Sequence, residues 1–213
     1  MRNFNQALDA YQAGDSKTAI QIWTQLAEAG DIRSQYNLGV LYESGEGIIQ
    51  NDWEAAHWFR QAAEQNFADA QFNLGIMLLS GQGVAVNTTE AFYWFFKAAE
   101  QGHVDACFNV GKCFAEGDGA EKDLDAAFKW YQVAADKVHV AAANNLGICY
   151  AMGHGVDRDD LQAYCWFNIA VELGDAVAVR HRERVAHELS AEQIVQAGKM
   201  SKSWLQSHLP GTR

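Results

Sequence analysis

The chain repeats itself every 36 residues, and this period constrains its fold more than any other feature of the sequence. Four markers recur at that spacing, namely a Leu-Gly pair, a Gly-x-Gly turn, a tryptophan and a pair of small residues. A period of this length is typical of stacked helical units, each of which buries its apolar face against its neighbours. The markers define four repeats, at residues 32–67, 68–103, 104–139 and 140–175.

Each repeat is expected to contain two helices joined by a glycine turn. In the first repeat, Leu38, Leu41 and Tyr42 share one face of a helix near residues 34–44. Gly45 ends that helix, because glycine adopts the left-handed conformation at low cost. Asn and Asp side chains cap helix N-termini, so the second helices are expected to begin at Asn51, Asn87, Asp123 and Asp159.

The second helices are expected to end at equivalent positions, which are Asn66, Gly102, Val138 and Gly174. Val138 departs from this pattern, because a β-branched residue disfavours a positive φ. Four more glycines stand inside the first helices: Gly39, Gly75, Gly111 and Gly147. Glycine in a helix interior costs about 1 kcal/mol relative to alanine. Its recurrence in register therefore implies that a second helix approaches closely at each of these positions.

The combined pattern resembles the Sel1-like repeat, a family of tetratricopeptide-like α/α-solenoids. The second repeat carries Leu74-Gly75, then Gly81-x-Gly83-Val84, then Ala91-x-x-Trp94-x-x-x-Ala98-Ala99. The resemblance covers about residues 32–175, with Val110 in place of Leu and Val138 in place of Gly as departures. It implies an all-α fold, a right-handed α/α superhelix of helix-turn-helix repeats with a period of 36 residues.

Both flanks of the repeats are predicted to be caps. Residues 1–31 keep the register with a shorter turn and are similar to an ordinary tetratricopeptide helix pair. Residues 176–213 are expected to form capping helices, and Ser190 to Gln193 resemble the capping box of a last helix that runs to about Leu205. Terminal repeats need such covers, because each solenoid unit is stabilised mainly by its neighbours.

The charge of the chain favours some partners over others. The net charge is −11, from 16 basic and 27 acidic residues, so nucleic acid and anionic membrane are not expected as partners. Residues 1–175 hold 10 basic and 24 acidic residues, whereas residues 176–213 hold 6 basic and 3 acidic ones. If Met1 is the native start, no signal peptide is present and a cytoplasmic location is expected.

Few residues suggest chemistry. Cys107, Cys113, Cys149 and Cys165 lack Cys-x-x-Cys spacing and are interpreted as small core residues, with a disulfide, a metal pair or a nucleophile as alternatives. Cys149 and His154 could form a dyad, because a thiolate needs a nearby base, but nothing supplies an oxyanion hole. No metal or cofactor is expected.

The histidines and tryptophans recur without forming a cluster. His103 and His139 occupy equivalent positions between repeats and are interpreted as exposed turn residues. The repeated tryptophans fall on one face of the second helices, where core packing is expected and a ligand cage is the alternative; they are Trp58, Trp94, Trp130 and Trp166.

One repeated residue type points to binding. Asn37, Asn73, Asn109 and Asn145 occupy the same first-helix position, although helix propensity disfavours Asn. In tetratricopeptide domains an Asn just before the Leu-Gly pair lies on the concave face and holds the backbone of a bound peptide, and the resemblance implies the same role here. Alternatively, each Asn hydrogen-bonds the neighbouring helix. Helical spacing adds the positions three and seven residues later: Val40, Ser44, Ile76, Ser80, Lys112, Glu116, Ile148 and Met152.

The sequence therefore predicts a non-catalytic protein–protein interaction scaffold or adaptor that binds a peptide or partner protein in a concave groove. The groove is expected to be apolar in repeats one, two and four and charged in repeat three. A regulatory subunit of a stable complex is one alternative. A hydrolase with β-lactamase-like activity, as claimed for some members of the family that the chain resembles, is another.

Overall fold

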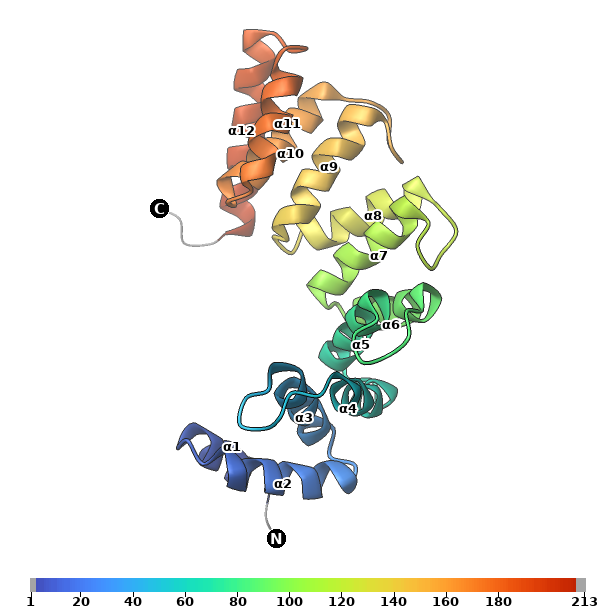
Figure 1. The fold of residues 1–213 in the computed structure, drawn as a ribbon. Helices are drawn as coiled ribbons and strands as arrows, with labels where there is room; N and C mark the ends of the chain where they lie inside the picture. The colour runs from blue at the N-terminus through green and yellow to red at the C-terminus, as the bar shows by residue number, and fades with distance from the viewer. Residues whose placement is uncertain (1–2, 210–213) are drawn as a thin grey trace. The chain divides into compact units, whose positions relative to one another are not determined.

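The computed structural model describes residues 3–209, and these residues form twelve α-helices without a strand (Figure 1). The predicted all-α solenoid is confirmed. Successive first helices of the four repeats begin 36 residues apart, and successive second helices also begin 36 residues apart. The first helices are α3 (Ile32–Ser44), α5 (Ala68–Ser80), α7 (Val104–Glu116) and α9 (Val140–Met152). The second helices are α4 (Asp52–Glu64), α6 (Thr88–Glu100), α8 (Leu124–Ala135) and α10 (Asp160–Glu172).

The helices form two compact units that divide between His103 and Val104, which is also the boundary between repeats two and three. Unit 1 holds α1 (Phe4–Gln12), α2 (Ser16–Glu28) and the first two repeats. Unit 2 holds the last two repeats, followed by α11 (Ala176–Ala186) and α12 (Ala191–His208). The flanking segments are thus helical where caps were predicted.

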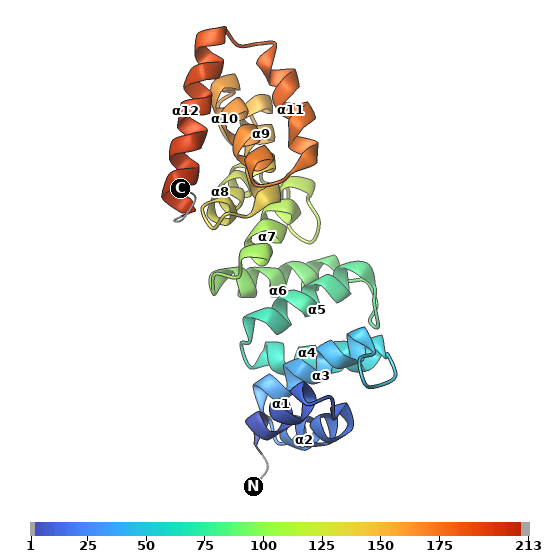
Figure 2. The ribbon, with the colours of Figure 1, turned by 90° about the vertical axis from the view of Figure 1, so that its left-hand side faces the viewer.

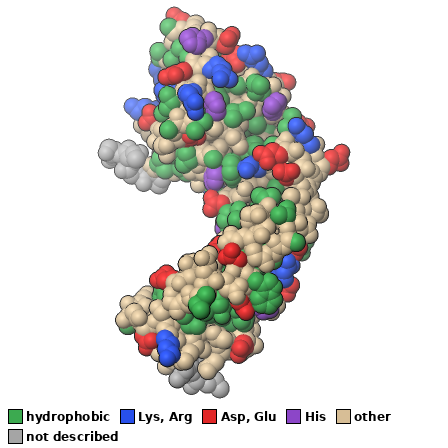
Figure 3. Space-filling model, viewed as in Figure 1, with side chains coloured by type: hydrophobic (Ala, Val, Ile, Leu, Met, Phe, Trp, Pro, Cys, Tyr) green, Lys and Arg blue, Asp and Glu red, His purple; other side chains and the backbone are tan. Residues whose placement is uncertain are grey.

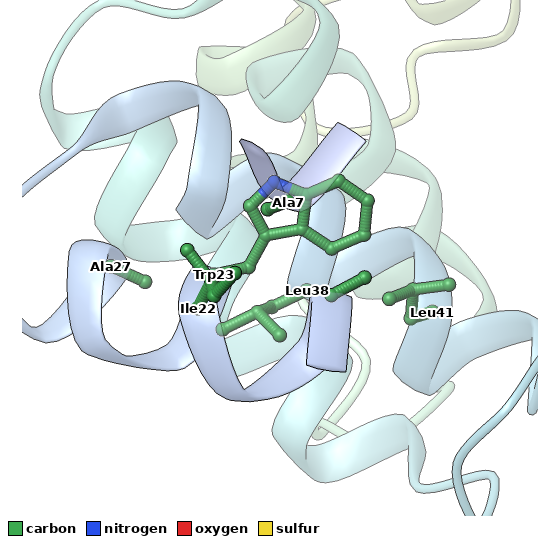
Figure 4. Packing of buried hydrophobic residues seen from close by; sticks show 7 residues of the cluster. Ala7, Ile22, Trp23, Ala27, Leu38 and Leu41 are labelled. Carbon is green, nitrogen blue, oxygen red and sulfur yellow. The ribbon is translucent and has the colours of Figure 1, made fainter. Parts of the chain in front are cut away.

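In unit 1 every helix packs against its neighbours in the sequence, from α1 to α6 (Figure 2). The packing begins in a buried cluster from α1, α2 and α3, in which the Trp23 indole lies beside Ala7 (Figure 4). Ile22 and Leu38 are buried in the same cluster. Further along, the Arg60 guanidinium on α4 donates to the Glu90 carboxylate on α6, which joins two second helices.

In unit 2 the helix α10 contacts α9, α11 and α12, so the last two helices pack on the fourth repeat. The Trp166 and Trp204 rings meet edge to face, with centroids 5.5 Å apart. Two hydrogen bonds also link these three helices. Arg182 on α11 donates to the Asn168 side-chain oxygen on α10, and the Asn168 amide donates to the Ser201 hydroxyl on α12, both at 2.8 Å. These aromatic and polar contacts fix α11 and α12 on α10.

The predicted caps of the second helices are present. Asn51 accepts hydrogen bonds from the backbone N–H groups of Trp53 and Glu54, and Asn87, Asp123 and Asp159 cap their helices in the same way. The helices end two or three residues earlier than predicted, and the residues that were expected to end them close a short turn instead. Val138 adopts a left-handed φ of 65° there despite its branched side chain, as Asn66 does with 66°.

The glycines inside the first helices mark close approach, as predicted. A Cβ atom on Gly75 would lie 2.6 Å from the Phe95 ring, and one on Gly147 would lie 2.5 Å from the Phe167 ring. Gly39 and Gly111 meet Phe59 and Tyr131 in the same manner. In each repeat, one aromatic ring of the second helix therefore packs directly against the backbone of the first helix.

Within residues 3–209, no helix combines the length and the apolar character that crossing a bilayer requires.

Candidate functional site

The twelve residues predicted to bind a partner share one property, which is that none of them is buried. Their neighbours on the same helices, such as Leu38, Gly39 and Leu41, are buried beneath the second helices. In each of the two units these residues thus form a strip on the first helices that the second helices do not bury. We call it the uncovered stripe: Asn37, Val40, Ser44, Asn73, Ile76, Ser80, Asn109, Lys112, Glu116, Asn145, Ile148 and Met152.

In unit 1 the stripe is tied together by a hydrogen bond between repeats. The Asn73 amide on α5 donates to the Tyr36 hydroxyl oxygen on α3, a contact that favours the ionised phenol. Burial outweighs it and raises the pKa of Tyr36 above its usual value. The Tyr36 ring also packs on Phe59 and Phe67, at centroid distances of 5.8 and 5.1 Å. The phenol is therefore held in place from three sides.

In unit 2 the stripe asparagines also find internal partners. Asn145 donates to the Tyr131 hydroxyl, whose pKa is raised, chiefly by burial. The Asn109 amide nitrogen donates to the Asp105 carbonyl oxygen of its own helix at 3.0 Å. These bonds are the alternative role considered for the asparagines. An Asn amide has two N–H donors and an oxygen with two lone pairs, so one internal bond leaves capacity for a second partner.

The other members of the stripe differ in exposure and chemistry. Val40, Ile76 and Ile148 are half-buried, and Met152 at the end of α9 is 65% exposed. The Ser80 hydroxyl donates back to the Ile76 carbonyl oxygen at 3.0 Å, so it is not committed to another helix. Lys112 and Glu116 supply the charges of repeat three. Four of the twelve stripe residues are thus apolar, and polar amides stand at one repeated position.

At repeat four the stripe opens into a pocket of about 200 Å³. Its apolar lining consists of Ile148, Ala151, Met152, Phe167 and Val185. Two basic side chains from α11, His181 and Arg184, complete the lining. The sequence predicted Ile148 and Met152 for this place but missed the contribution of α11, which lies outside the repeat period. We call this the repeat-four pocket.

The structure also reveals buried glutamines that were not predicted. Gln35 and Gln71 are 3% and 2% exposed, although they lie on the apolar faces of α3 and α5. The Gln71 amide donates to the Ala63 carbonyl oxygen at 3.1 Å and its side-chain oxygen accepts from Gln101 at 2.7 Å. Gln35 repeats this arrangement with Ala27 and Gln65. The bonds to Ala27 and Ala63 join each first helix to the preceding helix pair, and the glutamine pairs join the two helices of one repeat.

The interpretation of His103 and His139 as exposed turn residues was wrong. Each side chain is only 16% exposed and pairs with an aspartate on the first helix of the same repeat, His103 with Asp69 at 3.5 Å and His139 with Asp105 at 3.3 Å. Their rings stack on Phe72 and Phe108, with centroids 4.6 and 4.5 Å apart. The His139 Nδ1 also accepts the backbone N–H of Ala142 and caps α9. Both histidines therefore stabilise junctions within their own unit.

The four cysteines are buried thiols that form no disulfide, as the core interpretation predicted. Burial raises the pKa of the Cys113, Cys149 and Cys165 thiols to about 11, so these thiols carry their protons at neutral pH. A protonated thiol is a poor nucleophile, which gives no support to a dyad of Cys149 with His154. Among the described residues, no three His, Cys, Asp or Glu side chains are grouped to hold a metal ion.

The repeated tryptophans lie on the second helices. Trp94 and Trp166 are 8% and 9% exposed, while Trp58 and Trp130 are half-buried. The Trp94 indole N–H donates to the Glu90 carboxylate at 3.2 Å, which also accepts from Arg60. The packing role that was expected for the tryptophans agrees with this burial.

Comparisons with known proteins agree with the geometry. The Sel1 repeat family model matches four times, at residues 32–67, 68–103, 104–139 and 140–175. A Sel1 repeat protein from Oxalobacter formigenes is 27% identical and superposes with a TM-score of 0.76, over 96% of this chain and 98% of that chain. No curated protein matches the chain.

Two further solved structures are similar. The protective antigen c5321 of uropathogenic Escherichia coli, which has an SLR fold, is 28% identical with a TM-score of 0.62, over 97% of this chain and 53% of that chain. YrrB, described as a tetratricopeptide protein with an unusual peptide-binding site, is 20% identical with a TM-score of 0.56, over 85% of this chain and 90% of that chain. The likeness to YrrB is one of fold.

Proposed function

The chain belongs to the Sel1 repeat family, and we propose that it is a non-catalytic adaptor that binds a peptide or partner protein along the uncovered stripe. Folds of this Sel1 and tetratricopeptide-like type are generally protein-interaction scaffolds. The observation that carries the proposal is that none of the twelve stripe residues, which stand at equivalent positions of four first helices, is buried. A repeated, partly apolar strip suits a ligand that extends across several repeats.

The side chains of the stripe support a division of roles. Val40, Ile76 and Ile148 offer apolar contacts whose burial by a ligand is favourable. The asparagine amides offer hydrogen bonds to a peptide backbone, because they keep unused donors and lone pairs. The internal bonds of Asn73 and Asn145 hold these amides in one orientation before a ligand arrives. Such preorganisation lowers the entropic cost of binding.

The proposal is tested with a random-peptide display library selected on the immobilised full chain. Enriched peptides are synthesised, and their Kd is measured by fluorescence anisotropy. Asn109→Ala should weaken binding up to about tenfold, the value of roughly one hydrogen bond. It should leave the melting temperature almost unchanged, because the described bond of Asn109 is local to its own helix. Asn73→Ala should lower both affinity and stability, since it also removes the partner of Tyr36.

Two matched controls separate binding from folding. Lys112→Ala on the stripe and Lys129→Ala on α8 make the same chemical change, and only the first should alter Kd. Tyr36→Phe removes the internal partner of Asn73 and leaves the amide in place, so it should lower stability and weaken binding less than Asn73→Ala does. If no peptide is enriched, or if enriched peptides bind all stripe variants like the wild type, the stripe is not the binding surface.

A second candidate, the regulatory subunit of a stable complex, is favoured by an apolar patch in unit 1. Ile49, Trp53 and Val86 are 88%, 61% and 61% exposed. The loop that carries Val86 lies against the start of α4, where Gln82 donates to the Asp52 carboxylate at 3.1 Å. Figure 3 shows hydrophobic side chains gathered on this side of unit 1, over α3 and α4. A patch of several large apolar side chains that stay exposed often marks a surface that another protein covers.

The two candidates predict different behaviour of the patch. In a stable complex, the chain should elute from gel filtration of a native extract well above its own mass of 23.6 kDa. The double change Trp53→Ser and Val86→Ser should release it, while selected peptides still bind. An unchanged elution of the double variant would contradict the second candidate.

A further inference from the structure

The repeat-four pocket is held open by contacts that no other repeat has. The His181 Nδ1–H of α11 donates to the Asn144 side-chain oxygen of α9 at 2.9 Å, and the His181 ring lies 5.3 Å from the Phe167 ring. Asn144 takes the position that Tyr36, Phe72 and Phe108 occupy in the earlier repeats. This exchange of an aromatic ring for an amide lets α11 be fixed across α9 and α10. The pocket wall is thus set before any ligand binds.

The size and lining of the pocket restrict its ligand. About 200 Å³ is smaller than the pockets of roughly 300–1,000 Å³ that enclose whole small molecules. This volume suits a single large side chain. That side chain should be apolar, because five of the seven residues that line the pocket are apolar. Met152 at the rim is flexible and polarisable and so adapts to aliphatic or aromatic groups.

The charge beside the pocket restricts the ligand further. Arg180 and Arg184 are exposed and stand one helical turn apart on α11. Within residues 3–209 neither arginine takes part in an ion pair, and Glu183 is the one acidic residue of α11. Figure 3 shows Lys and Arg side chains over this helix. A basic edge on an otherwise acidic chain complements carboxylates.

We propose that the repeat-four pocket receives one large apolar side chain of an acidic peptide segment of a partner protein, and that Arg184 and Arg180 bind carboxylates next to that side chain. This inference rests on the proposed function and adds the chemistry of the partner. Arginine suits the role because its planar guanidinium binds a carboxylate through two parallel hydrogen bonds. Met152 and Ile148 then contact the apolar side chain while α11 supplies the charge.

The same peptide selection tests this inference. The enriched peptides should share a Leu, Ile, Met or Phe with Asp or Glu within about one helical turn of it. Arg184→Glu should weaken their binding about five- to tenfold, as expected when an exposed ion pair is replaced by repulsion. Versions of the peptides with Lys in place of Glu should bind Arg184→Glu more tightly than they bind the wild type. Ala151→Leu should fill the pocket and weaken both kinds of peptide.

Lys199→Glu is the matched control, because it makes the same charge change at an exposed site on α12, outside the pocket. It should leave Kd within about twofold of the wild type, since Lys199 is exposed and does not line the pocket, and exposed charges are screened by salt. Circular dichroism checks that each variant is folded. If Ala151→Leu fails to fold, Arg184→Glu and the charge-reversed peptides still decide the question.

The outcomes distinguish this inference from the proposed function. Enriched peptides that lack acidic residues, or that respond to Asn109→Ala but not to Arg184→Glu, would overturn the inference and leave the proposed function standing. A selection without any enriched peptide would contradict both. Self-association of the chain that Arg184→Glu abolishes would assign the pocket to a second copy of the chain, which also overturns the inference.

Discussion

Replacing Gly75 by Ala tests whether the closely packed helix pair sets the stability of a repeat. The added Cβ would lie 2.6, 2.7 and 3.1 Å from three atoms of the Phe95 ring. Phe95 is completely buried, so the ring cannot turn into solvent. Overpacking a core of this kind costs about 1–3 kcal/mol. Alanine recovers about 1 kcal/mol of helix propensity, so Gly75→Ala is expected to destabilise the chain by about 0–2 kcal/mol.

Gly198 on α12 supplies the matched control for this change. It also lies in a helix interior, but a Cβ there would have no atom within 4 Å. Gly198→Ala should therefore stabilise the chain by about 1 kcal/mol, the propensity term alone. The difference between the two variants isolates the clash, because the propensity term is common to both. It should amount to about 1–3 kcal/mol, or roughly 2–12 °C in melting temperature for a chain of this size.

Thermal melts followed by circular dichroism measure both variants, and a third variant identifies the cause. In a Phe95→Leu background the ring is gone, so Gly75→Ala should lose most of its penalty and the two changes should be strongly non-additive. If Gly75→Ala and Gly198→Ala stabilise the chain equally, the close packing of α5 on α6 does not explain the repeated glycine.

Three further predictions concern the junctions and the cysteines. Burial lowers the pKa of His139, so below about pH 6.5 the unfolded chain binds more protons at this residue than the folded chain does. The stability of the folded chain is therefore fully present above about pH 6.5 and is lost as the pH falls. In melts at a series of pH values, His139→Asn should lose stability less steeply on acidification than the wild type. Val138→Gly should stabilise the chain by up to about 1 kcal/mol, because a left-handed conformation costs a branched residue about 1–2 kcal/mol; a lower melting temperature would show that the Val138 side chain packs more favourably than its backbone is strained. Cys149 should react with a thiol reagent only in denaturant, because burial raises its pKa to about 11, and rapid labelling of the folded chain would contradict its assignment to the core.

Most of the fold could be predicted because the repeat supplies the same signal four times. The caps at Asn51 and its equivalents place each second helix, and the turn at Gly45 places the end of the first. The close approach at Gly75 could also be predicted, since an unfavourable glycine that recurs in register needs a packing reason. The helix ends were placed two or three residues late because a turn residue such as Asn66 follows the helix without belonging to it.

The histidines and glutamines were harder to interpret because their partners lie in other helices. His103 follows a glycine and looks like a turn residue, and only the folded register brings Asp69 and Phe72 to it. Gln71 gave a signal that could have been used. It stands three residues before Leu74 on the apolar face of α5, and Gln35 repeats it in α3. A polar residue that recurs on a buried face indicates a hydrogen bond across the interior.

The wall that α11 adds to the repeat-four pocket could not be predicted, because this helix lies outside the period. Nothing in the spacing of the repeats says that His181 meets Asn144 or that Arg184 reaches the end of α9. The stripe was predictable only as a set of equivalent positions, and the structure adds that these positions are uncovered. The repeat thus predicts the features that the four units share, whereas the contact made by a departing residue such as Asn144 is seen only in the folded structure.

The way in which the repeats are joined bears on how the stripe could act. In unit 1 two junctions each carry a buried glutamine whose amide donates to a carbonyl oxygen of the preceding helix, Gln35 to Ala27 and Gln71 to Ala63. The equivalent first-helix positions in unit 2 are Cys107 and Ala143, whose side chains carry no amide. Buried amide bonds are directional, and they fix a first helix on the helix before it more tightly than apolar contacts do. The stripe of unit 1 is therefore the more rigid part, suited to a ligand that matches its spacing. Unit 2, with its pocket beneath α11, instead offers a deeper contact for a single side chain.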